Sequence, residues 1–202
     1  WHEAPRLAVA AAPLPARGQS LELEGVSFGY RSDLPPVLDQ LSLQIAAGER
    51  VAVVGPSGAG KSTLAMLLMR QLDPQAGRVR LEGVDLRALD PDSLRRHVGL
   101  LSQRPILFRD TLAENLRIAR PEATEGELFH ALETAGLGDF VAGLDDALET
   151  WVDEAGTNLS GGEARRLALA RLVLTDCPIV ILDEPTTGLD AATARGLAGT
   201  LD

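Results

Sequence analysis

The sequence predicts an α/β fold, because strand-like and helix-like apolar patterns occupy separate blocks of the chain. LELEGVSFGY (21–30) and LSLQI (41–45) alternate like strands with one buried face, and VAVVG (51–55) is a continuous run typical of a strand buried on both faces. Residues 105–176 have helical character, and PIVIL (178–182) returns to a short apolar strand. We therefore expect an antiparallel β subdomain at the start, an α/β core and an inserted helical subdomain over about residues 104–170.

Further strands are expected in the first half of the chain. Residues 1–18 are rich in Ala and Pro, so we expect a linker from an upstream domain there and the ordered domain over 19–202. The alternation within 21–30 changes parity at Gly25, which predicts a β-bulge. RVRLEG (78–83) and HVGLLS (97–102) are expected to be two more short strands.

Five helical stretches can be justified in turn. Residues 61–71 are rich in helix formers, and Asp73-Pro74 ends the pattern. Three helices are expected in the middle of the chain, with no strand among them: TLAENLRIAR (111–120), EGELFHALETAG (125–136) and GEARRLALARLVLT (162–175). AATARGLAGTL (191–201) predicts a last helix.

Composition narrows the function classes. The formal net charge of −10 argues against broad electrostatic binding to nucleic acid or acidic lipid, since such binding needs a basic surface. The single cysteine, Cys177, cannot form an internal disulfide, which favours the cytosol. No apolar run reaches the roughly 18–20 residues of a membrane helix, and the start lacks the order of a signal peptide, so this chain is not expected to cross a membrane itself.

One lysine is conspicuous, because every other basic residue is an arginine. Lys61 lies in GPSGAGKS (55–62), which matches the phosphate-loop pattern G-x-x-x-x-G-K-[ST] between an apolar run and a helix. Such a loop turns backbone N–H groups toward phosphate, its lysine neutralises the β- and γ-phosphate oxygens, and its Ser62 hydroxyl can bind Mg²⁺. The alternative is an ordinary tight turn before a helix.

IVILDE (179–184) supplies acidic groups at the end of a strand. Two carboxylates in that place are often only a solvated strand end. Beside a phosphate loop, Asp183 is suited to hold Mg²⁺ through water, and Glu184 is suited to polarise an attacking water.

TNLSGGEARR (157–166) is a second glycine turn that leads into a helix. Helix N-termini can bind anions. Ser160 and Glu163 also have the S-x-x-E spacing of a capping box, in which each side chain accepts a hydrogen bond from the backbone N–H of the other residue. The residues alone leave both interpretations open. Likewise, Gln103 could be only a turn residue, and Tyr30, the only tyrosine, could simply pack on the core.

Taken together, the motifs resemble a known family. GPSGAGKS, Gln103 after a strand, LSGGE (159–163), ILDEP (181–185) and TTGLD (186–190), in that order, resemble the nucleotide-binding domain of ATP-binding cassette (ABC) proteins over about residues 20–202. The resemblance implies a P-loop NTPase (RecA-like) core, ATP and Mg²⁺ as ligands, and ATP hydrolysis. It also implies two such domains meeting head to tail, with the signature loop LSGGE of each capping ATP held by the other.

The same resemblance implies site residues. Catalytic roles fall to Glu184, Gln103 and Lys61, and Mg²⁺ contacts to Ser62, Gln103 and Asp183. The nucleotide contacts it implies, including an adenine-stacking tyrosine, are Tyr30, Gly55, Pro56, Ser57, Gly58, Ala59, Gly60, Lys61, Ser62, Thr63, Ser160, Gly161, Gly162, Glu163 and Asp190.

Within the family, TWVDEAGTNLSGGE (150–163) is similar to the exporter type. This implies attached transmembrane domains, a second nucleotide-binding domain, and a place on the cytoplasmic face of the bacterial inner membrane. Asp153 and Ala155 stand where the exporter pattern has Gly and Arg. The segments LLSQRPILF, LSGGEARRLALAR and LDEPTTGLDA resemble those of bacterial cysteine and glutathione exporters that support cytochrome bd assembly. This resemblance implies a heterodimer.

Two departures from the family pattern stand out. Position 163 is usually glutamine, and a carboxylate near the γ-phosphate of another chain's ATP is less favourable by Coulomb repulsion. The family also places a histidine on the strand after the helix that follows TTGLD, whereas this sequence stops at Asp202, so a C-terminally truncated domain is expected.

Two other function classes remain open. An ABC-type ATPase of DNA repair or chromosome maintenance shares the signature loop, although long coiled-coil insertions and a basic surface are missing from this sequence. A phosphate-loop kinase or GTPase would account for GPSGAGKS and ILDE but not for LSGGE. No nucleic-acid partner is expected.

Overall fold

The computed structural model describes residues 20–103 and 105–183, and these fall into two compact units. The first unit holds the described residues up to Gly99 together with Pro178–Ile181. The second holds the described residues from Leu100 to Cys177 together with Leu182 and Asp183. The predicted helix over 191–201 lies outside the described residues.

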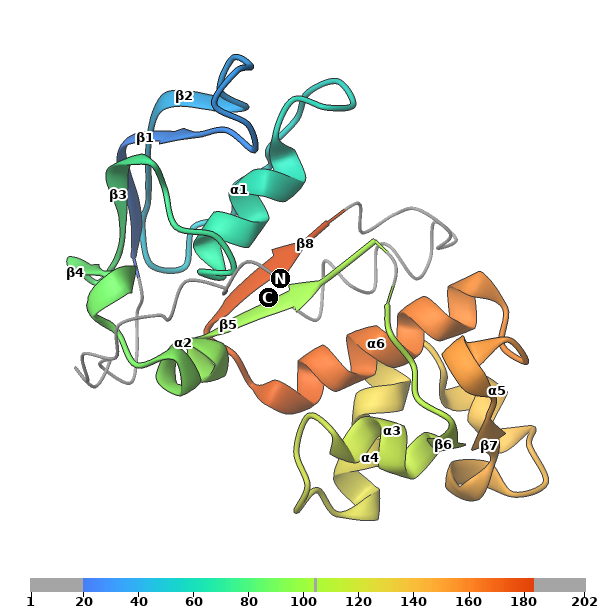
Figure 1. Ribbon diagram of the computed structural model, residues 1–202. Helices are drawn as coiled ribbons and strands as arrows, with labels where there is room; N and C mark the ends of the chain where they lie inside the picture. The colour runs from blue at the N-terminus through green and yellow to red at the C-terminus, as the bar shows by residue number, and fades with distance from the viewer. Residues whose placement is uncertain (1–19, 104, 184–202) are drawn as a thin grey trace. The chain divides into compact units, whose positions relative to one another are not determined.

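An antiparallel sheet dominates the first unit, as the alternating patterns predict (Figure 1). Its strand order is β2-β1-β3-β4. The strands are β1 (Leu21–Phe28), β2 (Leu38–Ile45), β3 (Ala76–Leu81) and β4 (Val84–Asp85). The register between β1 and β2 shifts between Leu23 and Val26, and Gly25 has a φ of 56°, so the predicted bulge is confirmed.

Helix α1 (Lys61–Leu68) supplies the helical side of this unit's core. Its buried Leu64, Leu67 and Leu68 share one apolar cluster with residues of β1 and β3. The 3-10 turn η1 (Leu86–Ala88) and α2 (Pro91–His97) follow β4, and α2 begins where the Asp90 carboxylate accepts a hydrogen bond from the Ser93 N–H at 2.8 Å. Strands β5 (Val98–Leu101) and β8 (Ile179–Leu182) form a separate two-stranded sheet.

The predicted strand over residues 51–55 is wrong. These residues have no regular secondary structure, and Val51, Val53 and Val54 are 40%, 50% and 88% exposed. A continuous apolar run becomes a buried strand only when neighbouring strands pair with it and other elements cover it. Among the described strands none pairs with this segment.

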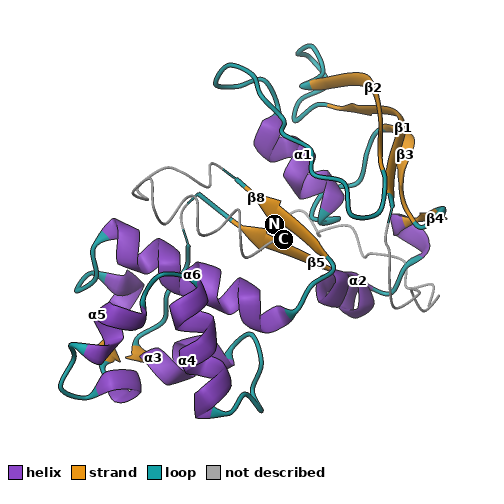
Figure 2. Ribbon diagram, turned by 180° about the vertical axis from the view of Figure 1, so that it is seen from behind, coloured by secondary structure: helices purple, strands orange, loops and turns teal. Residues whose placement is uncertain are grey.

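Helices make up most of the second unit (Figure 2). The three predicted helices are confirmed as α3 (Leu112–Arg117), α4 (Glu125–Thr134) and α6 (Gly161–Thr175). Helix α6 packs on α3 and α4, and its Leu167 and Ala170 are fully buried. The remaining helical elements are α5 (Gly138–Ala142) and the 3-10 turns η2 (Ala147–Glu149) and η3 (Glu154–Gly156).

One small correction concerns strands in this helical part. Strands β6 (Asp110–Thr111) and β7 (Trp151–Val152) pair antiparallel, although the sequence predicts no strand between 105 and 176. A pair of two-residue strands is too short to show an alternating pattern.

Candidate functional site

The phosphate loop has the backbone that its glycines predict. Gly58 and Gly60 have φ angles of 81° and 90°, which non-glycine residues rarely adopt. A Cβ at Gly60 would also lie 2.9 Å from a Leu38 methyl carbon and 3.0 Å from one of Val37. Gly60 therefore combines a left-handed turn with close packing, and α1 begins at the next residue.

The Lys61 side chain folds back over this loop. Its Nζ donates to the backbone oxygen of Gly55 at 2.9 Å and to that of Pro56 at 2.8 Å. The loop is closed by the Ala59 N–H, which donates to the Pro56 oxygen at 3.2 Å. The ammonium is held by the neutral backbone oxygens of Gly55 and Pro56, so its positive charge is available to a phosphate at the N-terminus of α1.

Tyr30 lies against the first turn of α1. Its hydroxyl is 3.1 Å from Oγ1 of the buried Thr63, and its ring meets Phe28 edge-on with centroids 5.1 Å apart. The residue is nevertheless 60% exposed. Core packing and an accessible aromatic face thus coexist, and such a face can stack on a purine. The exposed Ser62 lies on the same first turn as Thr63.

In the second unit, Gln103 and Asp183 follow β5 and β8. The Asp183 N–H donates to the Leu101 oxygen at 2.9 Å. The guanidinium of Arg165 donates to both segments. Its Nη2 donates to the backbone oxygen of Asp183 at 2.7 Å, and its Nη1 donates to the backbone oxygen of Gln103 at 3.4 Å. The structure therefore brings the backbones of these two predicted site residues together, through an arginine that sequence reasoning missed.

The capping box at the start of α6 is confirmed. The Glu163 N–H donates to Ser160 Oγ at 3.2 Å, and the Ser160 N–H donates to Glu163 Oε2 at 2.7 Å. Ser160 and Gly161 are exposed, and a Cβ added at Gly161 would meet nothing within 4 Å. The glycine-rich helix start is thus fixed in shape while open on its outer side.

The predicted Mg²⁺ ligands fit an ion that is shared with phosphate. No group of three or more His, Cys, Asp or Glu side chains in the described part of the chain could hold a metal alone. Mg²⁺ usually takes one or two protein oxygens and fills its remaining positions with water and substrate phosphates. The Ser62 hydroxyl on the first turn of α1 suits that pattern. Glu184 and Asp190 lie outside the described residues.

The sequence also did not predict an exposed apolar patch in the second unit. We define it by Ile106, Phe108 and Ile118, which are 72%, 51% and 55% exposed. The fully buried Asn115 anchors it, since its amide Nδ2 donates to the Phe108 oxygen at 2.8 Å and its Oδ1 accepts from the Phe108 N–H at 3.0 Å. Arg171 donates to the Ile106 oxygen, and burial lowers the pKa of its guanidinium to about 10.

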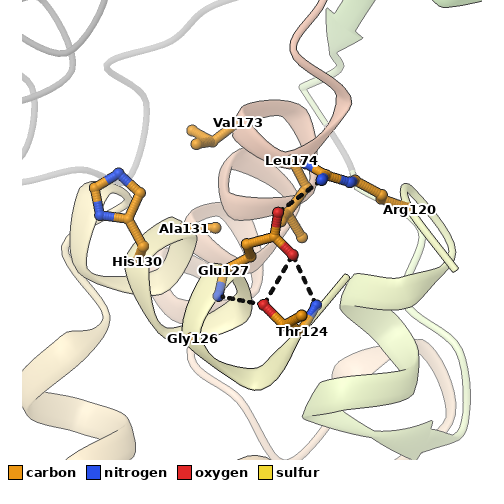
Figure 3. Close-up of a pocket in the computed structure, with 8 residues that line it drawn as sticks. All are labelled: Arg120, Thr124, Gly126, Glu127, His130, Ala131, Val173 and Leu174. Atoms are coloured by element: carbon orange, nitrogen blue, oxygen red, sulfur yellow. Dashed lines mark hydrogen bonds and ion pairs between the residues drawn. The ribbon is translucent and has the colours of Figure 1, made fainter. Parts of the chain in front are cut away.

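Away from these groups, a shallow pocket opens between α4 and α6 (Figure 3). Glu127 lies within it, accepting from the Thr124 N–H at 2.8 Å and from Arg120 Nη2 at 2.6 Å. The lining holds none of the predicted site residues; it consists of Arg120, Thr124, Gly126, Glu127, His130, Ala131, Val173 and Leu174.

Among the described helices, none has the length and apolar character needed to span a membrane.

Comparisons with known proteins agree with the motifs. A family model described as "ABC transporter" matches residues 38–187. The chain is 45% identical over 181 residues to the mitochondrial iron-sulfur clusters transporter ATM1 of Kluyveromyces lactis, covering 90% of this chain and 25% of that protein. It is 45% identical over 182 residues to the β-(1→2)glucan export ATP-binding/permease protein NdvA of Nitrobacter winogradskyi, covering 90% and 30%.

Two further similarities extend this set. The chain is 43% identical over 192 residues to the ATP-dependent lipid A-core flippase of Chromobacterium violaceum, covering 95% of this chain and 33% of that protein. A solved structure of a bacterial Atm1-family ABC exporter with ATP bound matches with a TM-score of 0.92 at 40% identity, covering 96% of this chain and 35% of the other. The expected P-loop NTPase fold is thereby confirmed, and the chain spans 25% to 35% of the length of these relatives.

Proposed function

The chain belongs to the ABC transporter family, and we propose that it is the ATP-binding and ATP-hydrolysing motor of an exporter. The observation that carries the proposal is the phosphate loop, with the Lys61 ammonium folded over Gly55 and Pro56 at the start of α1. This loop binds the β- and γ-phosphates of ATP through backbone N–H groups and Lys61, while the exposed face of Tyr30 stacks on the adenine.

Hydrolysis is an in-line attack of water on the γ-phosphate. Glu184 orients and polarises that water, and Gln103 would lie next to both the water and the metal when they are bound. Ser62, and Asp183 through water, would hold Mg²⁺, whose positive charge would neutralise charge on the phosphate oxygens. The binding of nucleotide and metal is part of this proposal. It is supported by the exposed Ser62 and by the Gln103 and Asp183 segments, which Arg165 holds together.

A second nucleotide-binding domain completes the site. The signature loop, residues 160–163, caps ATP held by that second domain, and Asp190 lies at the same interface. This explains a glycine-rich helix start that has no lysine of its own, since the partner domain's lysine arrives with its ATP. ATP binding closes the two domains and hydrolysis reopens them, on the cytoplasmic face of a membrane.

Transmembrane domains are the second kind of partner. The apolar patch of Ile106, Phe108 and Ile118 supports this, because all three large apolar side chains are exposed and two of them, Phe108 and Ile118, line one hollow. Asn115 and Arg171 hold the backbone of this segment in shape. We assign this patch to contact with the membrane domains. Its position just after Gln103 then links the ATP site to the membrane part.

The experiment that tests the motor function is steady-state ATP hydrolysis by the full-length protein. We expect Glu184→Gln to lower turnover by about 10² to 10⁴, since removal of a general base typically has an effect of that size. ATP binding should persist in this variant and fall in Lys61→Ala. Near-normal hydrolysis by Glu184→Gln would remove Glu184 from the proposed role.

The rival functions are distinguished by separate measurements. Stimulation of hydrolysis by DNA would favour an ATPase of DNA repair or chromosome maintenance, whereas the three compared relatives are named as a transporter, an export protein and a flippase. A phosphate-loop kinase or GTPase would not form dimers that depend on ATP.

A narrower proposal concerns the cargo. Similarity of LLSQRPILF and LSGGEARRLALAR to bacterial thiol exporters supports export of cysteine or glutathione by a heterodimer of the bacterial inner membrane, in aid of cytochrome bd assembly. The compared relatives are named for other cargoes: iron-sulfur clusters, β-(1→2)glucan and lipid A-core. ATP-dependent uptake of labelled cysteine or glutathione into inverted membrane vesicles tests the narrower proposal, and ATP hydrolysis without such uptake contradicts it alone.

A further inference from the structure

Arg165 occupies an unusual position for an arginine. It lies about one turn after Gly161 on α6, and only 3% of it is exposed. Arginines are rarely fully buried unless their donors are used. Two of its donors bind backbone oxygens from segments far apart in the sequence, those of Gln103 and Asp183.

These two contacts fix the segments to one helix. The Asp183 bond is short, at 2.7 Å, and the Gln103 bond is longer, at 3.4 Å, while the Asp183 N–H also bonds the Leu101 oxygen. A guanidinium is planar and presents its donors in fixed directions, so it can hold two acceptors at a set separation. The first turn of that same helix carries the capping box of Ser160 and Glu163.

We propose that Arg165 is a positioning residue for ATP hydrolysis, which sets the separation of Gln103 and Asp183 and ties both to the signature helix. The inference rests on the proposed function. In this role Arg165 acts through the backbones of Gln103 and Asp183, the residues assigned to water and metal. When the signature loop contacts a partner's ATP, any movement of α6 therefore also moves the residues that contact water and Mg²⁺.

The test compares Arg165→Met and Arg165→Lys in the full-length protein. Met keeps a long apolar stem without donors, and Lys keeps the charge but replaces the planar fork with a single ammonium. Arg70→Met is the matched control, because it removes another buried guanidinium, 7% exposed, whose partners are the Leu89 backbone oxygen and the Asp73 carboxylate. For each variant we would measure the thermal midpoint, the Kd for ATP in EDTA, and kcat and KM for Mg-ATP.

We expect kcat of Arg165→Met to fall about 10- to 100-fold, the range typical of residues that orient a metal site's ligands. The Kd for ATP in EDTA should change less than about twofold, since the phosphate loop is untouched, and Arg165→Lys should recover part of kcat. Arg70→Met should lower the thermal midpoint without this selective loss of kcat.

Three outcomes would overturn the inference. Wild-type kcat in a folded Arg165→Met protein would do so, and so would equal losses of kcat, ATP affinity and thermal midpoint in the Arg165→Met and Arg70→Met variants. A wild-type protein that binds no ATP would overturn the proposed function together with this inference, whereas the first two results overturn the inference alone.

Discussion

Glu163 stands where the family usually has glutamine, and its two roles can be separated. Both residues close a capping box, so Glu163→Gln should leave the free energy of unfolding nearly unchanged. Removing the carboxylate should strengthen ATP-dependent association, because it removes repulsion from a partner's γ-phosphate. Thermal unfolding and the ATP dependence of association check the two parts.

A control separates helix capping from ATP contact at the same loop. Ser160→Ala removes the hydroxyl that accepts the Glu163 N–H and should cost about 1 kcal/mol of stability. If Glu163→Gln destabilised the protein as much as Ser160→Ala does, the proposed equivalence of Glu and Gln in the cap would be wrong.

Glu127 gives a residue-scale prediction about pH. The hydrogen bond from the Thr124 N–H, followed by that from the Thr124 hydroxyl, lowers the pKa of this carboxyl below its usual range. Because the folded pKa is depressed, the contribution to stability is present above the unfolded pKa and is lost as pH falls through the folded pKa. Carboxyl NMR titration should show the low pKa, and Thr124→Val should raise it part of the way. An unshifted Glu127 in the wild type would contradict this account.

The sequence predicted the structural position of some single residues but not of others. Lys61 was predictable, because it is the only lysine and lies at a fixed place in a spaced motif. Arg165 was not, because it is one arginine among many and its burial depends on segments at Gln103 and Asp183 that are distant in the sequence.

At the scale of elements, the meeting of β1 and β3 depends on one glycine. Gly77 has a φ of 77°, and a Cβ there would lie inside van der Waals contact with the backbone oxygens of Glu24 and Gly25. Gly77→Ala should therefore destabilise the protein by about 3 kcal/mol or more, through backbone strain and displacement of the bulged strand. Denaturant unfolding measures this.

Gly83 offers the matched control. Its φ is 73°, yet a Cβ there would meet nothing within 4 Å, so Gly83→Ala should cost only about 1 kcal/mol of backbone strain. Equal losses for the two alanine variants would show that the contact with β1 contributes nothing.

Elements with a clear local sequence signal were predictable, and those that depend on neighbouring strands were not. Helices α4 and α6 and the bulge in β1 follow from local spacing and confirmed the expectation. Helix α2 was missed although Asp90-Pro91 is a helix-start signal. The prediction of a strand over residues 51–55 was wrong, because pairing with a neighbouring strand, not hydrophobicity, decides whether an apolar run forms a strand.

At the scale of the whole molecule, the apolar patch should separate ATP hydrolysis from transport. Ile118→Asp places a charge on a 55% exposed apolar position. We expect transport by the full-length protein to fall about tenfold or more, as for loss of a central interface residue, while thermal stability changes little. Transport and hydrolysis measured on the same reconstituted protein check this; unchanged transport would exclude Ile118 from the contact.

The partner and the cargo belong to this scale as well, and the sequence of this domain could support them only through resemblance. A motif such as LSGGE is complete in one chain, but the ATP it is proposed to cap is held by another. The contacts that would select a cargo belong to the transmembrane domains that we propose as partners.

The central claim is that ATP joins the phosphate loop of one domain to the signature loop of a second. In a Cys177→Ser and Glu184→Gln background, Ser57→Cys and Gly161→Cys place thiols on the two loops, and Gly161 has open space for the new side chain. The account predicts a cross-link between two chains whose yield rises with ATP and is abolished by Lys61→Ala. Cross-linking that is absent with ATP, or equally strong without it, would contradict the claim.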